Sequence, residues 1–164
     1  MILTLENAKQ LLTEAPDGVI QFTVLRDRPR KWFMSWLPRR KFFMVTKTLL
    51  VKLSNGEVVV IHEGLKTDFS SVPRLLWSVV SPFGDFALAA LIHDLLYIYT
   101  LGERKEADKE MLIWSNALSK NKIDNYLRFY AVRAFGWIVW NQSKKNQNIY
   151  PYEKGFERRL TVFS

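Results

Sequence analysis

The stretch from Phe86 to Tyr99 constrains the fold most, because tyrosine hydroxyls aside its only polar side chains are those of His93 and Asp94. A membrane-spanning helix needs roughly 18 or more apolar residues, and this run is shorter and carries a charge at its centre. It is therefore predicted to form a buried helix over residues 86–100, with Gly102 as the residue that ends it. Burying an unpartnered carboxylate would cost several kcal/mol or neutralise it, so both side chains need partners.

Helical spacing decides which of these groups can meet. His93 and Tyr97 are four residues apart and share a face, whereas Asp94 points about 100° away from His93. The two therefore cannot simply pair with each other. Nearby titratable and charged residues give the possible partners: His62, Asp68, Arg74, Asp85, Arg104 and Asp108.

One arrangement satisfies all of these groups. Asp108 would accept the Nδ1 proton of His93 and leave Nε2 facing a cleft. Asp94, with Asp68 and backbone carbonyls near Gly84, would hold a divalent cation, calcium in preference to magnesium or zinc. An imidazole oriented by a carboxylate beside a cation can activate water. In the alternative interpretation, His93 and Asp94 are structural and are paired with backbone groups or with an arginine.

The pattern along the chain predicts an α+β fold with an N-terminal β-hairpin layer and a four-helix half. Expected elements are a helix at 5–13, strands at 19–25, 42–53 and 57–62, and helices at 71–80, 86–100, 106–120 and 123–140. Ser54-Asn55-Gly56 predicts a hairpin, because Asn-Gly readily supplies two positive φ angles. The next-to-last helix should bury Ala107, Met111, Trp114 and Leu118. The last should bury Leu127, Tyr130, Ala131, Ala134, Trp137 and Ile138, and residues 141–164 should form an irregular basic tail.

Length and composition fit one domain over residues 1–164, mainly β in 1–66 and helical in 67–140. The chain has no cysteine, which excludes disulfides and thiolate metal sites. No signal peptide is recognisable at Met1–Glu6, and a cytoplasmic location is expected.

The net charge of +8 is unevenly distributed. Residues 67–118 hold 4 Lys and Arg against 7 Asp and Glu, while the flanking parts are strongly basic. A local acidic region in a basic protein suits a cation site on a molecule whose other faces attract polyanions. A generic solvated basic surface is the alternative.

The segment 26–41 combines seven basic residues with large aromatic side chains. Such a mixture suits phosphate contacts with base stacking, and equally an anionic membrane surface. In the alternative, its aromatic residues pack into the core while the arginines face water. The polyanion-binding candidates are Arg26, Arg28, Arg30, Lys31, Trp32, Trp36, Arg39, Arg40 and Lys41.

Three ordered motifs, Thr67–Pro73, His93–Tyr97 and Arg104–Asp108, resemble a small phage-associated family of domains of unknown function. The family pattern is T-D-F-x-S-x-P, H-D-x-L-Y and S-R-K-E-A-D, and the similarity covers about residues 40–136. Glu103 stands where the pattern has serine, which alters a helix cap. The resemblance implies a phage or prophage origin, with the protein in the host cytoplasm or in the phage particle.

The H-D-x-x-Y helix followed by an aspartate on the next helix is also similar to the secretory phospholipase A-two pattern. That similarity implies that His93 activates water, Asp94 holds calcium and Asp108 orients His93. Tyr97 would then donate a hydrogen bond to these groups. Apart from that similarity, Arg104 is a further candidate for supporting the site. The chain lacks the disulfides and the full glycine-rich calcium loop of those enzymes.

Other enzyme classes are disfavoured. Histidine-rich metal phosphohydrolases and zinc proteases need more ligands than His62 and His93 provide. The chain has no P-loop, dinucleotide fingerprint or nucleophile elbow. Two hypotheses follow. The first is a cation-assisted hydrolase of an ester or phosphoester, with a lipid as one candidate substrate, and the second is a non-enzymatic virion-associated or host-interaction protein. In the second, the basic aromatic surface would bind nucleic acid, membrane or a phage or host protein.

Overall fold

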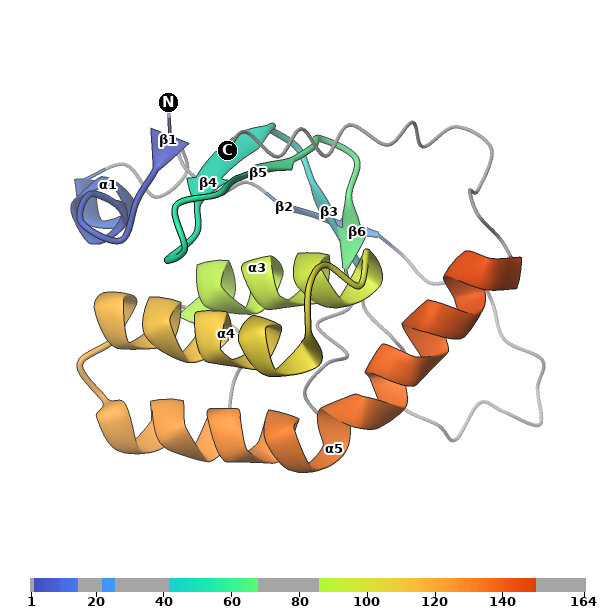
Figure 1. Ribbon diagram of the computed structural model, residues 1–164. Helices are drawn as coiled ribbons and strands as arrows, with labels where there is room; N and C mark the ends of the chain where they lie inside the picture. The colour runs from blue at the N-terminus through green and yellow to red at the C-terminus, as the bar shows by residue number, and fades with distance from the viewer. Residues whose placement is uncertain (1, 15–21, 26–41, 68–85, 150–164) are drawn as a thin grey trace, which may run out of the picture.

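In the described part of the chain, short strands and one short helix occupy the first half and longer helices the second, so the predicted α+β class is confirmed (Figure 1). The computed structural model describes residues 2–14, 22–25, 42–67 and 86–149. In chain order the first elements are β1 (Ile2–Leu3), α1 (Ala8–Glu14), β2 (Phe22–Leu25), β3 (Phe42–Val45), β4 (Leu49–Lys52), β5 (Val58–Ile61) and β6 (Lys66–Thr67). The helices α3 (Ala87–Ile98), α4 (Arg104–Leu118) and α5 (Lys122–Ile149) follow. The helix predicted over 71–80 lies outside the described residues.

The strands form two small sheets rather than one layer. One has the order β1-β4-β5, with β1 parallel to β4, and the other has the order β2-β3-β6. The single strand predicted over 42–53 is therefore wrong, because β3 and β4 belong to different sheets. Two backbone hydrogen bonds join the end of β3 to the residues just before β6. The Val45 N–H donates to Leu65 O at 2.9 Å, and the Gly64 N–H donates to Val45 O at 2.7 Å.

The predicted hairpin is confirmed. Strands β4 and β5 pair antiparallel from Leu49–Ile61 to Lys52–Val58, and the Leu53 N–H donates to Glu57 O at 2.7 Å. Gly56 has φ +91°, but Asn55 is not among the described residues with positive φ. The turn therefore needs one left-handed residue rather than the two expected, as in three-residue hairpin loops that end in glycine.

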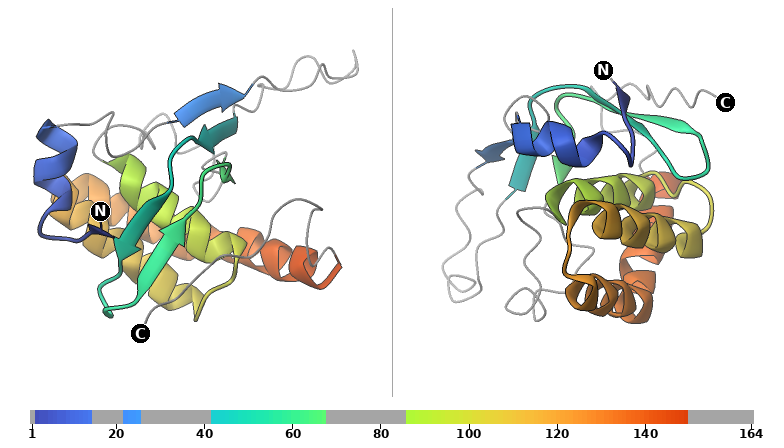
Figure 2. Two further views of the ribbon diagram at one scale, coloured as in Figure 1. Left: turned by 90° about the horizontal axis from the view of Figure 1, so that it is seen from above. Right: turned by 90° about the vertical axis from the view of Figure 1, so that its left-hand side faces the viewer.

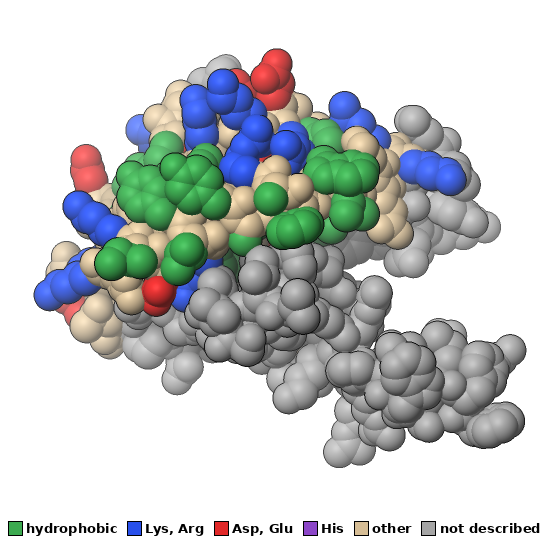
Figure 3. Space-filling model, turned by 90° about the horizontal axis from the view of Figure 1, so that it is seen from below, with side chains coloured by type: hydrophobic (Ala, Val, Ile, Leu, Met, Phe, Trp, Pro, Cys, Tyr) green, Lys and Arg blue, Asp and Glu red, His purple; other side chains and the backbone are tan. Residues whose placement is uncertain are grey.

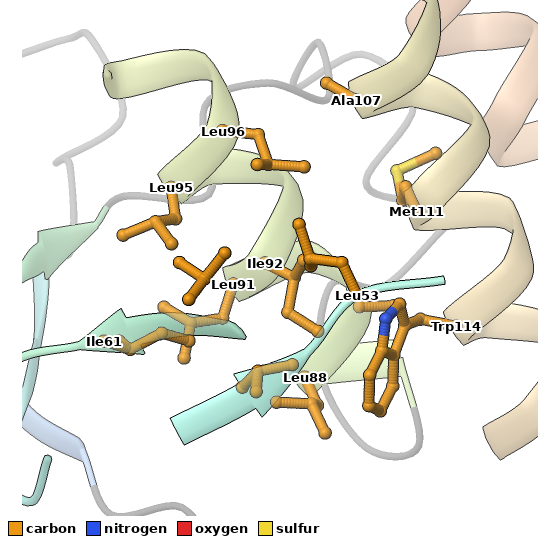
Figure 4. Packing of buried hydrophobic residues seen from close by; sticks show 14 of the residues in the cluster. Leu53, Ile61, Leu88, Leu91, Ile92, Leu95, Leu96, Ala107, Met111 and Trp114 are labelled. Atoms are coloured by element: carbon orange, nitrogen blue, oxygen red, sulfur yellow. The ribbon is translucent and has the colours of Figure 1, made fainter. Parts of the chain in front are cut away.

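Helix α3 is the centre of the molecule. All ten residues from Leu88 to Tyr97 are buried, because α3 lies between the sheets on one side and α4 and α5 on the other (Figures 1 and 2). Its apolar side chains meet those of the hairpin and of α4 in one cluster (Figure 4). The predicted buried helix is thus confirmed, and each large aliphatic side chain in it stabilises the fold by about 1.5–3 kcal/mol.

The end of α3 differs from the expectation. Thr100, with φ +47°, takes the C′ position directly after the helix, and Gly102, predicted there, has φ +65° two residues further on. The Thr100 N–H donates to Tyr97 O and the Leu101 N–H donates to Leu96 O, at 3.2 and 3.0 Å. This is the Schellman pattern of helix termination, displaced two residues from the predicted site.

Helix α4 buries the predicted face, consisting of Ala107, Met111, Trp114 and Leu118. It starts after Glu103, whose N–H donates to the Glu106 carboxylate at 3.2 Å. The glutamate that replaces the expected serine therefore still begins a helix with an acidic first turn.

Helix α5 buries the face opposite to the one predicted. It buries Asn125, Val132, Gly136 and Trp140. Most of the residues expected in the core are on the surface instead. Each of Leu127, Tyr130, Trp137 and Ile138 is at least half exposed. The helix also continues to Ile149, so the irregular tail predicted from Asn141 begins too early. Among the described residues, no helix is long and apolar enough to cross a membrane.

A buried carboxylate links the hairpin to the helices. Glu110, on α4 and 7% exposed, accepts hydrogen bonds from the Ser54 N–H at 2.8 Å, the Ser54 hydroxyl at 2.5 Å and the Trp114 indole at 2.9 Å. Three donors compensate the carboxylate for leaving water. The hairpin turn is thereby fixed to the middle of α4.

We predict that Glu110→Ala lowers the free energy of unfolding by about 2–3 kcal/mol, because three donors lose a charged acceptor. Glu110→Gln should lose less, since its amide oxygen still accepts. Urea denaturation measures both, with Lys109→Ala at the exposed neighbouring position as the control, expected within about 0.5 kcal/mol of the wild type. Equal stability of Glu110→Ala and the control would contradict the proposed link.

Candidate functional site

The structure brings His93, Tyr97 and Asp108 together in the core between α3 and α4. His93 Nε2 lies 3.0 Å from Asp108 Oδ1, and the Tyr97 hydroxyl donates to the same oxygen at 2.6 Å. The two aromatic rings, one helical turn apart on α3, have centroids 4.1 Å apart. The expected pairing of His93 with Asp108 is therefore present.

Two arginines complete the environment of Asp108. Arg133 of α5 donates to Oδ2 at 2.7 Å, and Arg104 of α4 donates to the same oxygen at 3.4 Å. Arg104 also donates to the backbone carbonyl of Arg133 at 3.2 Å. A side chain with no exposed surface thus accepts four donors from three helices, as a carboxylate with two oxygens can.

The close approach of α5 to this cluster requires a glycine. A Cβ at Gly136 would lie 2.5 Å from the Tyr97 hydroxyl and 3.3 Å from a Val132 methyl group. Trp140, one turn further along α5, contacts the Tyr97 ring edge-on with centroids 5.0 Å apart. Gly136 and Trp140 therefore fix the position of the phenol that holds Asp108.

The hydrogen bonds determine the charge of Asp108. Burial by itself raises the pKa of this carboxyl, but the hydrogen bonds from His93, Tyr97 and Arg133 outweigh burial and hold the pKa below its ordinary value. Burial and then the hydrogen bond to Asp108 raise the pKa of Tyr97 above its ordinary range. Asp108 is therefore an anion and Tyr97 a neutral donor.

This charge state also fixes the direction of the hydrogen bond to His93. An ionised carboxylate only accepts hydrogen bonds, so Nε2 is the donor to Asp108. The prediction that Nδ1 bonds Asp108 is wrong. The orientation of the ring depends on how α3 packs on α4, which the spacing of residues along one helix does not specify.

Asp94 lies beside this cluster and is 5% exposed. It takes part in an interaction within the protein and so is not a free ligand. Calcium needs six to eight oxygen ligands, and no group of three or more His, Cys, Asp or Glu side chains arranged for a metal occurs among the described residues. Asp68, its predicted partner, lies outside them. The cation therefore remains a prediction.

The expected cleft is absent from the described surroundings of the histidine. His93 is 1% exposed and Asp108 is fully buried. A cavity of about 400 Å³ lies instead between the hairpin turn and α4, lined by Leu53, Leu96, Leu101, Ala107 and Glu110 among others. The His93–Asp108 pair, called the dyad below, is thus closed to solvent in this conformation.

Arg133 and Glu110 were not predicted as members of the site or of the core. Each binds a residue at least 25 positions away in the sequence. The sequence around a charged helical residue does not indicate which distant residue it will contact. The segment 26–41, with all of its candidate polyanion-binding residues, lies outside the described part of the chain.

Comparison with protein-family models matches residues 43–132 to a family described as "Protein of unknown function (DUF1353)". No curated protein matches the chain. No solved structure matches it. The match confirms the expectation of a domain of unknown function, while the phage association stays a prediction.

We predict that Asp108→Asn destabilises the protein by about 3 kcal/mol near neutral pH, because two guanidinium groups lose their buried counter-ion. The pKa of Asp108 is lowered on folding, so its stabilisation is present above the ordinary carboxyl pKa of about 4 and lost as the pH falls through the folded value. The difference between wild type and variant should therefore shrink in acid.

Urea denaturation at neutral pH and near pH 3 tests this. Asp124→Asn, which removes a more accessible carboxylate on α5, serves as the matched control and should cost less than about 1 kcal/mol. A pH-independent difference for Asp108→Asn would contradict the assigned charge.

Proposed function

The chain belongs to the DUF1353 family, described only as being of unknown function, and we propose that it is a hydrolase of an ester or phosphoester. His93 is the general base and Asp108 orients it. One observation carries the proposal: Nε2 of a core histidine is held by a carboxylate at 3.0 Å, which leaves Nδ1 as the basic nitrogen.

The proton transfers follow from this tautomer. Nδ1 removes a proton from water while the water oxygen forms a bond to the carbonyl carbon or phosphorus. As the bond to the leaving oxygen breaks, His93 returns the proton to that oxygen. Asp108 keeps its negative charge throughout and stabilises the imidazolium that exists between the two transfers.

The other members of the cluster are positioning residues. Arg104 and Arg133 both contact Oδ2, so Oδ1 is left to His93 and Tyr97. The short hydrogen bond from Tyr97 keeps that oxygen aimed at the imidazole. Because the four donors come from three helices, the carboxylate has little freedom to rotate.

A divalent cation, with calcium favoured, is proposed to bind at Asp94, with Asp68 as a second ligand. Such a cation, when bound, would stabilise negative charge on the oxygen of the attacked group. Oxygen ligands and the absence of cysteine favour calcium over zinc. The proton transfers described above use only the protein's own groups.

The burial of His93, Asp94 and Asp108 favours a second candidate function. In this proposal the cluster is structural and the protein is a non-enzymatic phage component, either virion-associated or directed at the host. Four hydrogen bonds to one buried carboxylate would then serve only to join α3, α4 and α5.

We predict that His93→Gln lowers turnover at least 10³-fold, because an amide cannot take a proton from water. The variant should keep its fold, since the glutamine amide can still donate to Asp108. The assay is a panel of carboxylic esters, phosphodiesters and phospholipid vesicles with millimolar calcium, magnesium or manganese. His62→Gln, at the chain's other histidine, is the matched control and should keep full activity.

The second candidate predicts a different outcome for the same set of proteins. Wild type would hydrolyse nothing in the panel, and His93→Gln would change only the stability. Turnover that survives His93→Gln would falsify the assignment of the base.

We further predict that calcium raises the thermal unfolding midpoint of the wild type by several degrees at millimolar concentration, because a ligand that binds the native state stabilises it. Asp94→Asn should remove the shift. Differential scanning fluorimetry with calcium, magnesium and manganese measures it, with the Asp124→Asn variant as control. An unfolding midpoint that none of the three ions changes would contradict the cation site. The role of His93 and Asp108 would still be tested separately by the turnover assay.

A further inference from the structure

The outward face of α5 is an apolar stripe that the core does not use. Ile123, Tyr126, Leu127, Tyr130, Trp137 and Ile138 are between 45% and 75% exposed. Successive members are one, three or seven residues apart, which at 100° per residue places all six within about 120° of the helix circumference. At 1.5 Å per residue they span about 22 Å along the helix, which bends partway along its length (Figure 1). Figure 3 shows hydrophobic side chains gathered along this side of the molecule.

The stripe is separate from the packing face. The side of α5 that contacts α3 and α4 is formed by Asn125, Val132, Gly136 and Trp140, all buried. Substituting the stripe therefore leaves these four buried residues unchanged. Arg133, which donates to Asp108, neighbours both Tyr130 and Trp137 on the helix, so the fold of each variant is checked as well. Figure 3 shows this surface as groups of hydrophobic side chains with Lys and Arg side chains between them. Apolar surface of this extent with polar residues around it is typical of interaction sites.

The charges around the stripe indicate an anionic partner. Helix α5 carries five Lys and Arg and one acidic residue, Asp124. Lys122, Lys144 and Lys145 are exposed near the two ends of the stripe, and Figure 3 shows Lys and Arg side chains beside the hydrophobic ones. A second copy of the same helix would bring like charges together, which opposes self-association.

The residue types further indicate the kind of anionic partner. Tyrosine and tryptophan prefer the boundary between lipid headgroups and acyl chains, where their rings are both apolar and polar. Ile123, Leu127 and Ile138 add aliphatic surface, which a lipid bilayer accommodates and a phosphate backbone does not. Basic residues at the ends of the stripe can contact anionic headgroups.

We propose that the outward face of α5 binds the surface of an anionic lipid bilayer, with the helix lying in the plane of the interface. The aromatic and aliphatic stripe enters the headgroup region, and the lysines contact lipid phosphates or carboxylates. This surface does not depend on the proposed hydrolase activity, and His93→Gln should bind lipid as the wild type does.

The test is co-sedimentation of the full chain with vesicles of phosphatidylcholine alone or with about one third phosphatidylserine. Wild type should bind the anionic vesicles at least tenfold more tightly, and binding should weaken with added salt. The double variant Tyr130→Ser, Trp137→Ser should reduce this affinity at least tenfold. Phe135→Ser is the matched control: Phe135 is equally exposed but lies off the stripe, and its variant should bind like the wild type.

Each other outcome identifies a different occupant and overturns the proposal. Unchanged lipid binding by the double variant would assign the membrane contact to another part of the chain. Concentration-dependent dimers in sedimentation velocity, lost in the double variant, would assign the stripe to a second copy. Binding to single-stranded nucleic acid that the double variant loses, without vesicle binding, would assign it to a nucleic acid. Thermal unfolding of every variant shows whether the fold is retained.

Discussion

The rest of the structure depends on one fully buried carboxylate, that of Asp108. Its two oxygens accept hydrogen bonds from His93, Tyr97, Arg104 and Arg133, which come from α3, α4 and α5. Without these donors an ionised carboxylate would be far too costly in the core. With them, its pKa is lowered and the charge persists. The packing of α5 against α3 and α4 is therefore tied to the same group that sets the orientation of His93.

Arg104 and Arg133 hold Asp108 in place, but they also weaken its electrostatic effect on His93. Two guanidinium groups on Oδ2 already balance the charge of Asp108, so less of its negative potential remains for an imidazolium at Oδ1. Neither arginine is fully buried, with 21% and 32% of the side chains exposed, and solvent therefore screens part of their charge. A hydrolytic role for His93 consequently needs access for water and substrate that the closed conformation does not give, and it gains from any cation near Asp94.

Local patterns predicted some parts of the fold and site well. The apolar run around His93 specified a buried helix, because no other arrangement removes so many adjacent apolar side chains from water. The position of Asp108 one turn into the next helix, on its buried face, predicted the pairing with His93. The rotation of the imidazole and the role of Arg133 depend on how helices pack, and the residues within one helix do not contain that information.

The error on α5 has a physical cause that bears on function. The periodicity of Leu127, Tyr130 and Trp137 correctly identified a helical stripe, and a stripe of this kind usually faces the core. Here the core side is formed by Asn125, Val132, Gly136 and Trp140, and only at Gly136 does the close approach of Tyr97 exclude a side chain. The helix thus holds Asp108 with one face through Arg133 and leaves its most apolar face to an external surface. The proposed contact with a lipid surface uses these exposed aromatic side chains, and it does not require His93 to be a catalyst.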